Sequence, residues 1–178
     1  TPAGVTTLTK QIAASTDDVE QNNTNGSIST SSSDLEFTWD NHAQTIGMRF
    51  PSLAIPKGAT IVNASIQFVG KETQSDVTNI TFFGQAIDNA PTFTTSTNNV
   101  SNRQKTASSI LWNTIPVWSV NGTYQTPLLT SIVQEVVNRP GWTNGNANAF
   151  IVTGTGHRTA YSFNVNATKA PKLTVSYQ

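Results

Sequence analysis

The stretch from Ile61 to Val69 alternates between apolar and polar side chains with a period of two residues. This period puts alternate side chains on opposite faces of an extended chain and predicts a half-buried β-strand. Pro56 and Gly58 precede it and predict a turn. The side chains predicted to face the core are Val62, Ala64, Ile66 and Phe68, and those predicted to face solvent are Asn63, Ser65 and Gln67. This stretch therefore indicates a fold that contains strands with one buried face and one exposed face.

Other segments repeat this strand character. Asp34 to Trp39 alternates, which predicts that Leu35, Phe37 and Trp39 point inward. The connection from Asp88 to Ser109 is rich in Thr, Ser and Asn, and we expect it to be mainly a surface loop. The remaining segments with strand character are 45–50, 77–86, 149–154, 159–165 and 172–177. Together they predict an all-β domain with about eight to ten strands.

One short α-helix is predicted over about residues 126–139. Thr126 is suited to cap its start, Pro127 suits its first turn, and Pro140 with Gly141 ends it. Its apolar side chains recur at helical spacing and predict a helix that covers one end or flank of the strands. A single helix among many strands predicts a jelly-roll-type β-sandwich rather than a parallel α/β sheet.

The length of 178 residues suits one domain with a sizeable core. We place this domain at residues 10–178 and treat residues 1–9 as an extended N-terminal segment. Two roles are open for that segment. It is an edge strand of the domain's own sheet, or a donor strand that pairs with a neighbouring subunit.

Charge and cysteine content limit the partners and the setting. Ten basic and ten acidic residues cancel, and only 11% of residues are charged, so nucleic acid is not an expected partner. No apolar run reaches the roughly 20 residues of a membrane span. Cysteine is absent, which excludes disulfides and thiolate metal sites. The polar, uncharged surface and the start at Thr1 without a methionine lead us to expect an extracellular or cell-surface protein.

A group of acidic residues is the best candidate for a metal site. Hard oxygen ligands of this kind suit calcium, which takes about six to eight of them, although no EF-hand spacing is present. The alternative interpretation is a solvated acidic edge. The candidate calcium ligands are Asp17, Asp18, Glu20, Asp34 and Glu36.

Tryptophan supplies the candidate sugar-binding surface. Trp118 and Tyr124 flank the Asn121-Gly122 turn, and we predict that they are exposed and stack on a sugar ring; the alternative is loop packing. Trp142 follows the end of the predicted helix and is expected to seal the sandwich.

No residue pattern of an enzyme is recognisable. The stretch Gly154 to Arg158 is rich in glycine but precedes a strand, so we interpret it as a hairpin turn and not as a phosphate-binding loop. Neither a nucleophile elbow nor a pair of catalytic carboxylates is evident. The two histidines, His42 and His157, are far apart in the sequence. We therefore expect a protein without catalytic activity.

Seven asparagines stand in acceptor sequences for N-linked glycans. In a chain this rich in Asn, Ser and Thr, about four or five such sequences arise by chance. The candidates are Asn22, Asn25, Asn63, Asn79, Asn99, Asn121 and Asn166.

Several short motifs resemble a recurrent β-sandwich module. They are Asp17-Asp18-Val19-Glu20, Asp34-Leu35-Glu36, Ile46-Gly47-Met48-Arg49-Phe50, Ile55-Pro56-Lys57-Gly58-Ala59-Thr60-Ile61, Trp112, Trp118, Gly141-Trp142 and Pro171-Lys172-Leu173. Such modules are similar to jelly-roll carbohydrate-binding modules and occur as non-catalytic units of large secreted and cell-surface bacterial proteins. The resemblance extends from about Lys10 to the end of the chain.

Two functions agree with these observations. The first is a self-assembling structural subunit of an extracellular fibre or surface layer, joined through β-sandwich contacts to copies of itself. The second is a carbohydrate-binding or adhesion module of a larger secreted protein, with a polysaccharide as its partner. Exposed tryptophans around a groove would favour the second function, and an N-terminal segment outside its own domain would favour the first.

Overall fold

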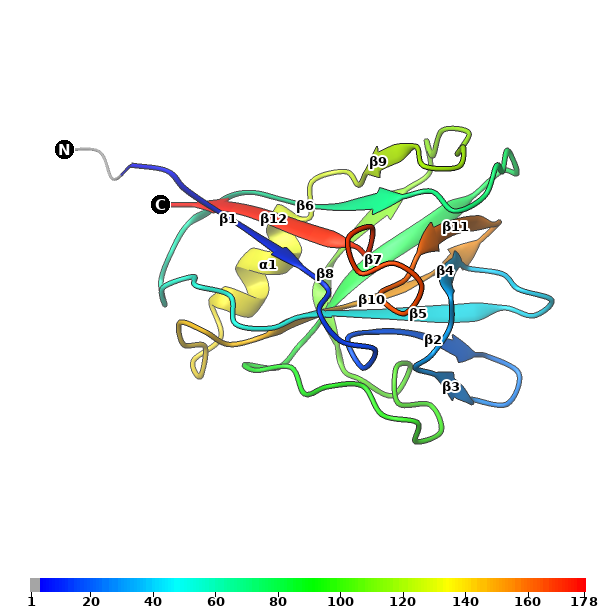
Figure 1. Cartoon of the computed structure of the whole chain (residues 1–178). Helices are drawn as coiled ribbons and strands as arrows, with labels where there is room; N and C mark the ends of the chain where they lie inside the picture. The colour runs from blue at the N-terminus through cyan, green and yellow to red at the C-terminus, as the bar shows by residue number, and fades with distance from the viewer. Residues whose placement is uncertain (1–3) are drawn as a thin grey trace.

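The computed structural model describes residues 4–178 and consists of two facing antiparallel sheets and a small third one (Figure 1). The four-stranded sheet has the order β1 (Thr6–Gln11), β12 (Lys172–Tyr177), β6 (Ile61–Val69), β9 (Thr123–Gln125). The six-stranded sheet has the order β3 (Ile28–Ser29), β2 (Asp18–Asn22), β5 (Gln44–Phe50), β10 (Asn148–Thr155), β7 (Asn79–Gln85), β8 (Lys105–Trp112). A two-stranded sheet pairs β11 (Arg158–Tyr161) with β4 (Asp34–Phe37).

This strand order is that of a jelly roll. Eight strands form the two layers, in the orders β1-β12-β6-β9 and β5-β10-β7-β8, so that strands next to each other in the chain often lie in opposite sheets. The hairpin of β2 and β3 extends the second layer beyond β5. The predicted fold class, an all-β jelly-roll-type sandwich with one short helix, is confirmed.

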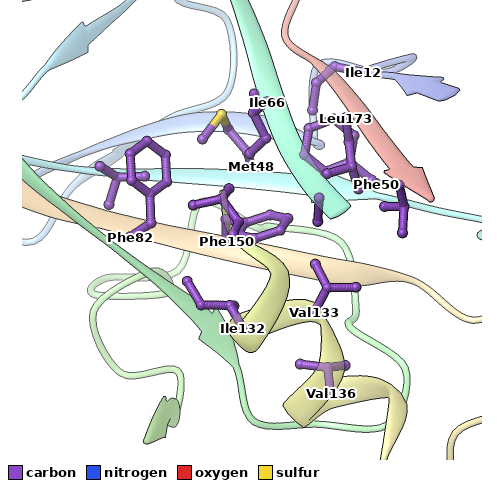
Figure 2. Packing of buried hydrophobic residues seen from close by; sticks show 14 of the residues in the cluster. Ile12, Met48, Phe50, Ile66, Phe82, Ile132, Val133, Val136, Phe150 and Leu173 are labelled. Carbon is purple, nitrogen blue, oxygen red and sulfur yellow. The ribbon is translucent and has the colours of Figure 1, made fainter. Parts of the chain in front are cut away.

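The core lies between the two sheets and is closed by the helix. In Figure 2 the side chains of Phe82 and Phe150 from one sheet and Ile66 and Leu173 from the other converge on this core. Helix α1 (Thr130–Val137) packs against β6 of one sheet and β7 and β8 of the other. Its apolar face is completely buried, and this face comprises Ile132, Val133, Val136 and Val137.

The helix begins later than predicted. Its N-cap residue is Leu129, without a side-chain cap, whereas Thr126 was expected to fill this role. Thr126 is instead tied to β6, where its Oγ1 accepts a hydrogen bond of 3.0 Å from the Ile66 N–H. The helix ends at Val137, just before the Pro140-Gly141 stop that the sequence predicts.

The side chains of β6 predicted to face the core are buried from Ala64 onward, but the prediction fails at the first residues of the strand, and Ser65, predicted to face solvent, is only 6% exposed. Ala64, Ile66 and Phe68 are fully buried, whereas Val62 is 38% exposed and Ile61 is buried in its place. The register between β12 and β6 shifts at this point and skips one residue of β6. A bulge of this kind turns the side chains that precede it to the opposite face.

The connection between β7 and β8 is not the plain surface loop that was expected. Its Phe93 and Val100 are buried against Val19 and Ile151 on the outer face of the six-stranded sheet. A second, smaller core therefore lies outside the sandwich.

The N-terminal segment pairs with its own domain. Strand β1 runs antiparallel to β12 at the edge of the four-stranded sheet, and its side chains are mostly exposed or half-buried. Residues 1–3 of the expected extended segment lie outside the described residues. Within residues 4–178, no helix has the length and apolar character needed to cross a membrane.

Candidate functional site

Trp39 stands on the loop that follows β4 and is 51% exposed. The prediction that it points inward is wrong, because β4 ends at Phe37 and the alternation ends with it. The Thr38 N–H donates to the Gly156 carbonyl oxygen at 3.0 Å, and an isolated bridge joins Trp39 to Ala43. The loop thus folds back on itself and holds the indole at the surface.

A pocket of about 570 Å³ lies beside Trp39. Its far wall is the link between β10 and β11, where Gly156 has a φ of +93° and a Cβ would stand 2.5 Å from the Thr78 Cα. This link was predicted to be a hairpin turn, but the two strands that it joins lie in different sheets. The polar side chains lining the pocket are Thr38, Asp76, Thr155 and His157.

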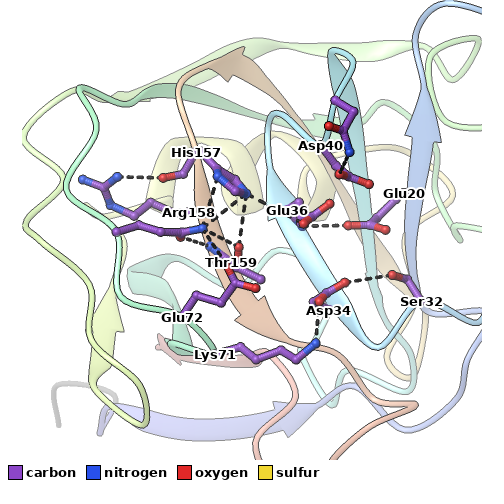
Figure 3. Close-up of polar contacts among 12 residues, drawn as sticks. Glu20, Ser32, Asp34, Glu36, Asp40, Lys71, Glu72, His157, Arg158 and Thr159 are labelled. Atoms are coloured by element: carbon purple, nitrogen blue, oxygen red, sulfur yellow. Dashed lines mark hydrogen bonds and ion pairs between the residues drawn. The ribbon is translucent and has the colours of Figure 1, made fainter.

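Three carboxylates meet near this pocket, within the described residues. Glu20 of β2 and Asp34 and Glu36 of β4 each offer an oxygen atom within 4.8 Å of the others (Figure 3). Glu20 Oε1 also accepts the Glu36 N–H at 2.7 Å, so the two strands are joined at this point. Lys71 pairs with Asp34, and His157 Nε2 lies 3.7 Å from Glu36 Oε1.

Burial makes this cluster unfavourable for full ionisation. Burial raises the pKa of Glu20 to about 7. Burial and the neighbouring charge of Glu20 raise the pKa of Glu36 to about 8, with smaller contributions from Asp40 and Asp34. Carboxylates crowded together in a poorly solvated place hold protons at neutral pH unless a cation joins them.

Asp17 and Asp18, the other two candidate ligands, are not among the three that meet. Asp17 Oδ1 accepts a hydrogen bond from Arg49 Nη1 at 2.8 Å, which makes a mostly buried ion pair. Asp18 Oδ2 accepts the Phe163 N–H at 2.7 Å, and burial raises the pKa of Asp18 to about 7. The predicted five-residue calcium set therefore reduces to Glu20, Asp34 and Glu36.

Trp118 and Tyr124 do not form the exposed pair that was predicted. Trp118 is 1% exposed, and the ring of Tyr124 stacks on it with centroids 4.7 Å apart and planes 6° from parallel. The Trp118 backbone exchanges two hydrogen bonds with Gln74, which pulls the residue inward. Both faces of the indole are thus unavailable to a ligand. Trp142, by contrast, is fully buried as predicted, with its Nε1 donating to the Ile55 carbonyl oxygen.

Sequence reasoning missed two residues of this region. His157 was set aside because no other histidine stands near it in the sequence, yet β11 pairs with β4 and brings it to Glu36. Asp40, on the loop after β4, helps to raise the pKa of Glu36. A chain-distant pairing of two short strands creates both contacts, and no local pattern reveals it.

The acceptor asparagines lie on the surface. Asn25, Asn63 and Asn121 are exposed, and Asn22, Asn79, Asn99 and Asn166 are half-buried. Asn63 stands on the solvent face of β6 as its alternation predicts, so a glycan there would leave the core intact. Whether any of the seven asparagines carries a glycan stays a prediction.

The chain matches no known protein-family model and no curated protein sequence. The geometry around Trp39 and the three carboxylates is therefore the basis for assigning a function.

Proposed function

We propose that the protein is a non-catalytic extracellular module that binds carbohydrate in the pocket beside Trp39. The observation that carries this proposal is the exposed indole at the pocket wall, since the other three tryptophans are buried. A flat aromatic face suits the apolar face of a sugar ring. The pocket also falls within the range of about 300–1,000 Å³ that is typical of small-ligand sites.

Polar side chains beside the mostly apolar lining of the pocket support a ligand that has both hydroxyl groups and an apolar ring face. Asp76 offers acceptor oxygens and Thr155 offers a hydroxyl group, both on the same pocket as the indole. No large surplus of charge exists in the chain, so the expected ligand is a neutral polysaccharide.

Replacing Trp39 with alanine is expected to weaken carbohydrate binding at least about tenfold, which corresponds to about 1.4 kcal/mol. A glycan array would first identify the sugars that bind, and titration calorimetry would then compare the variants on the best of them. Trp39→Phe keeps an aromatic face and should retain part of the affinity. Leu111→Ala, at a residue that is 55% exposed and does not line the pocket, serves as the matched control.

Absence of binding to every glycan on the array would overturn the proposal. Equal binding by the wild type and Trp39→Ala would also overturn it, because the bound sugar would then lie elsewhere. Release of reducing ends from the bound polysaccharide would contradict the non-catalytic role.

A second candidate function, assembly into a fibre or surface layer, is favoured by the edge position of β1. This strand pairs on one side only, and its side-chain bonds to β12 are the hydroxyl contacts of Thr7 with Ser176 and Thr9 with Thr174. An edge strand leaves one row of its backbone groups unpaired, so it can exchange with that of a neighbouring copy.

We expect that assembly, if it uses β1, is lost when residues 1–8 are removed. Negative-stain electron microscopy should then reveal filaments for the full chain and single particles for the truncated one. A variant that lacks only residues 1–3 keeps all of β1 and serves as the control. Single particles in all three samples would contradict this second function.

A further inference from the structure

When ionised, the three carboxylates of Glu20, Asp34 and Glu36 carry more negative charge than their neighbours balance. Lys71 bonds to Asp34, and His157 lies beside Glu36, but Asp40 adds a further negative charge close to Glu36 (Figure 3). Glu20 is 7% exposed and lacks a cationic partner among the described ion pairs. Such a group is stabilised by a bound cation.

A separate polar pocket of about 270 Å³ opens onto Glu20. Asp40 and Gln44 also line it, so the loop after β4 and the start of β5 both face this space. Its lining is almost entirely oxygen- and nitrogen-bearing, and the remaining lining residues are Asn22, Ser27, Ser29, Ser32 and His42.

Gln44 provides an observation that is independent of the carboxylates. This side chain is 4% exposed, and its buried amide oxygen accepts no hydrogen bond. Buried polar atoms in folded proteins nearly always have a partner, so an oxygen without a protein partner in the wall of a polar pocket is suited to bind an ion or a water molecule. A cation would satisfy this oxygen and the Glu20 carboxylate together.

We propose that a calcium ion binds where Glu20 connects this pocket to the carboxylate cluster. Its carboxylate ligands are Glu20, Asp34 and Glu36, whose oxygen atoms lie within 4.8 Å of one another, and Gln44 and Asp40 of the pocket lining are further oxygen donors. The donors are hard oxygen atoms, which select calcium or magnesium over softer transition metals. Calcium is favoured because it accepts about six to eight oxygen ligands in irregular geometry, whereas magnesium requires a near-octahedral shell. The ion ties β2 to β4 and to the loop that carries Trp39, and this inference does not depend on sugar binding.

Calcium is expected to raise the melting temperature of the wild-type protein by several degrees relative to the same protein in EDTA, since a ligand that binds only the folded state stabilises it. Titration calorimetry with calcium chloride measures the affinity directly. Glu20→Gln and Glu36→Gln should each weaken calcium binding at least tenfold and remove most of the shift. Gln44→Met, which keeps the side-chain volume but lacks the oxygen, should weaken binding less and tests the site if a glutamate variant fails to fold.

Glu72→Gln is the matched control, because Glu72 lies on the neighbouring loop and bonds to Gln74 but is outside the cluster. It should leave the calcium response unchanged. Without calcium, Glu36→Gln is expected to melt at a higher temperature than the wild type, because it removes a carboxyl group whose ionisation this crowded site disfavours. A wild-type melting temperature that is the same in calcium and EDTA would overturn the proposal. A full calcium response in Glu20→Gln and Glu36→Gln, or equal affinity for magnesium, would overturn it as well.

Discussion

Replacing Trp118 with alanine is expected to lower the free energy of unfolding by about 3–5 kcal/mol, the usual effect of removing a large buried aromatic side chain. Trp118 is 1% exposed and packs on Tyr124, with Phe68 and Trp112 at centroid distances of 6.0 and 6.5 Å. The cavity left behind would lie at the junction of the four-stranded sheet and the loop before β9. Urea denaturation followed by circular dichroism measures the change, and the melting temperature should fall by about 10 °C.

Two further variants separate packing from polar effects. The Trp118 indole N–H is buried without a hydrogen-bond partner, so Trp118→Phe breaks no bond and should cost much less than alanine. Trp39→Ala, at the half-exposed tryptophan, should change stability by no more than about 0.5 kcal/mol. If Trp39→Ala destabilised the protein as much as Trp118→Ala, the assignment of one tryptophan to the surface and the other to the core would be wrong.

These two tryptophans also mark where sequence patterns succeed and fail. The two-residue period predicts the faces of a strand, and it correctly places Leu35 and Phe37 in the core. It cannot predict where the strand ends, and the position of Trp39 depends on that end. Trp118 was predicted to be exposed because it stands near a polar turn. Its backbone instead pairs with Gln74, which is distant in the sequence.

Only part of the acidic cluster could be predicted from the sequence. Asp34 and Glu36 share one face of a predicted strand, so their proximity follows from local alternation. The approach of Glu20 depends on its bond to the Glu36 N–H, and the separation of Asp17 depends on Arg49 from the neighbouring strand. Composition and periodicity thus predicted the jelly-roll class and part of the site, because both reflect local physics. The pairings between distant strands, which complete the site, have no local signature.

The connection between β7 and β8 leads to the second prediction. It was expected to be a surface loop because polar residues dominate it, yet the buried side chain of Arg103 holds it together with hydrogen bonds. Arg103 is 8% exposed, and its guanidinium Nη atoms donate to Gln85 Oε1 and to the carbonyl oxygens of Pro91 and Thr92 at 2.8–2.9 Å. Two more bonds run to the carbonyl and side-chain oxygens of Asn99. All five N–H donors of the group are therefore used.

Within residues 4–178, no carboxylate forms an ion pair with this buried cation. Every acceptor of Arg103 is neutral, and its charge lies over the ring of Phe93, 3.9 Å from the centroid. Burial, with a smaller effect of Arg49, lowers the pKa of Arg103 to about 10, so the group stays protonated at neutral pH. The guanidinium thus stabilises the connection through hydrogen-bond geometry rather than through an ion pair.

Arg103→Met is expected to lower the free energy of unfolding by about 3–5 kcal/mol, since hydrogen bonds to a charged group contribute about 1.5–3 kcal/mol each and not all are replaced by water. The apolar stem can still cover Phe93, so the loss reports mainly on the polar contacts. Urea denaturation measures the total change. The variant should also show faster amide hydrogen exchange in residues 86–104 and a smaller change in the strands of the sandwich, because Arg103 holds this connection specifically.

The conservative variant and the control make this prediction specific to geometry. Arg103→Lys keeps the positive charge but has a single ammonium group that cannot reach acceptors on so many sides, so it should lose nearly as much stability as Arg103→Met. Arg139→Met removes an arginine whose ion pair with Asp88 is more than one-third exposed on both side chains, and it should change stability by no more than about 1 kcal/mol. If Arg103→Lys kept full stability, the positive charge, and not the five N–H donors of the guanidinium, would hold the connection against the sheet.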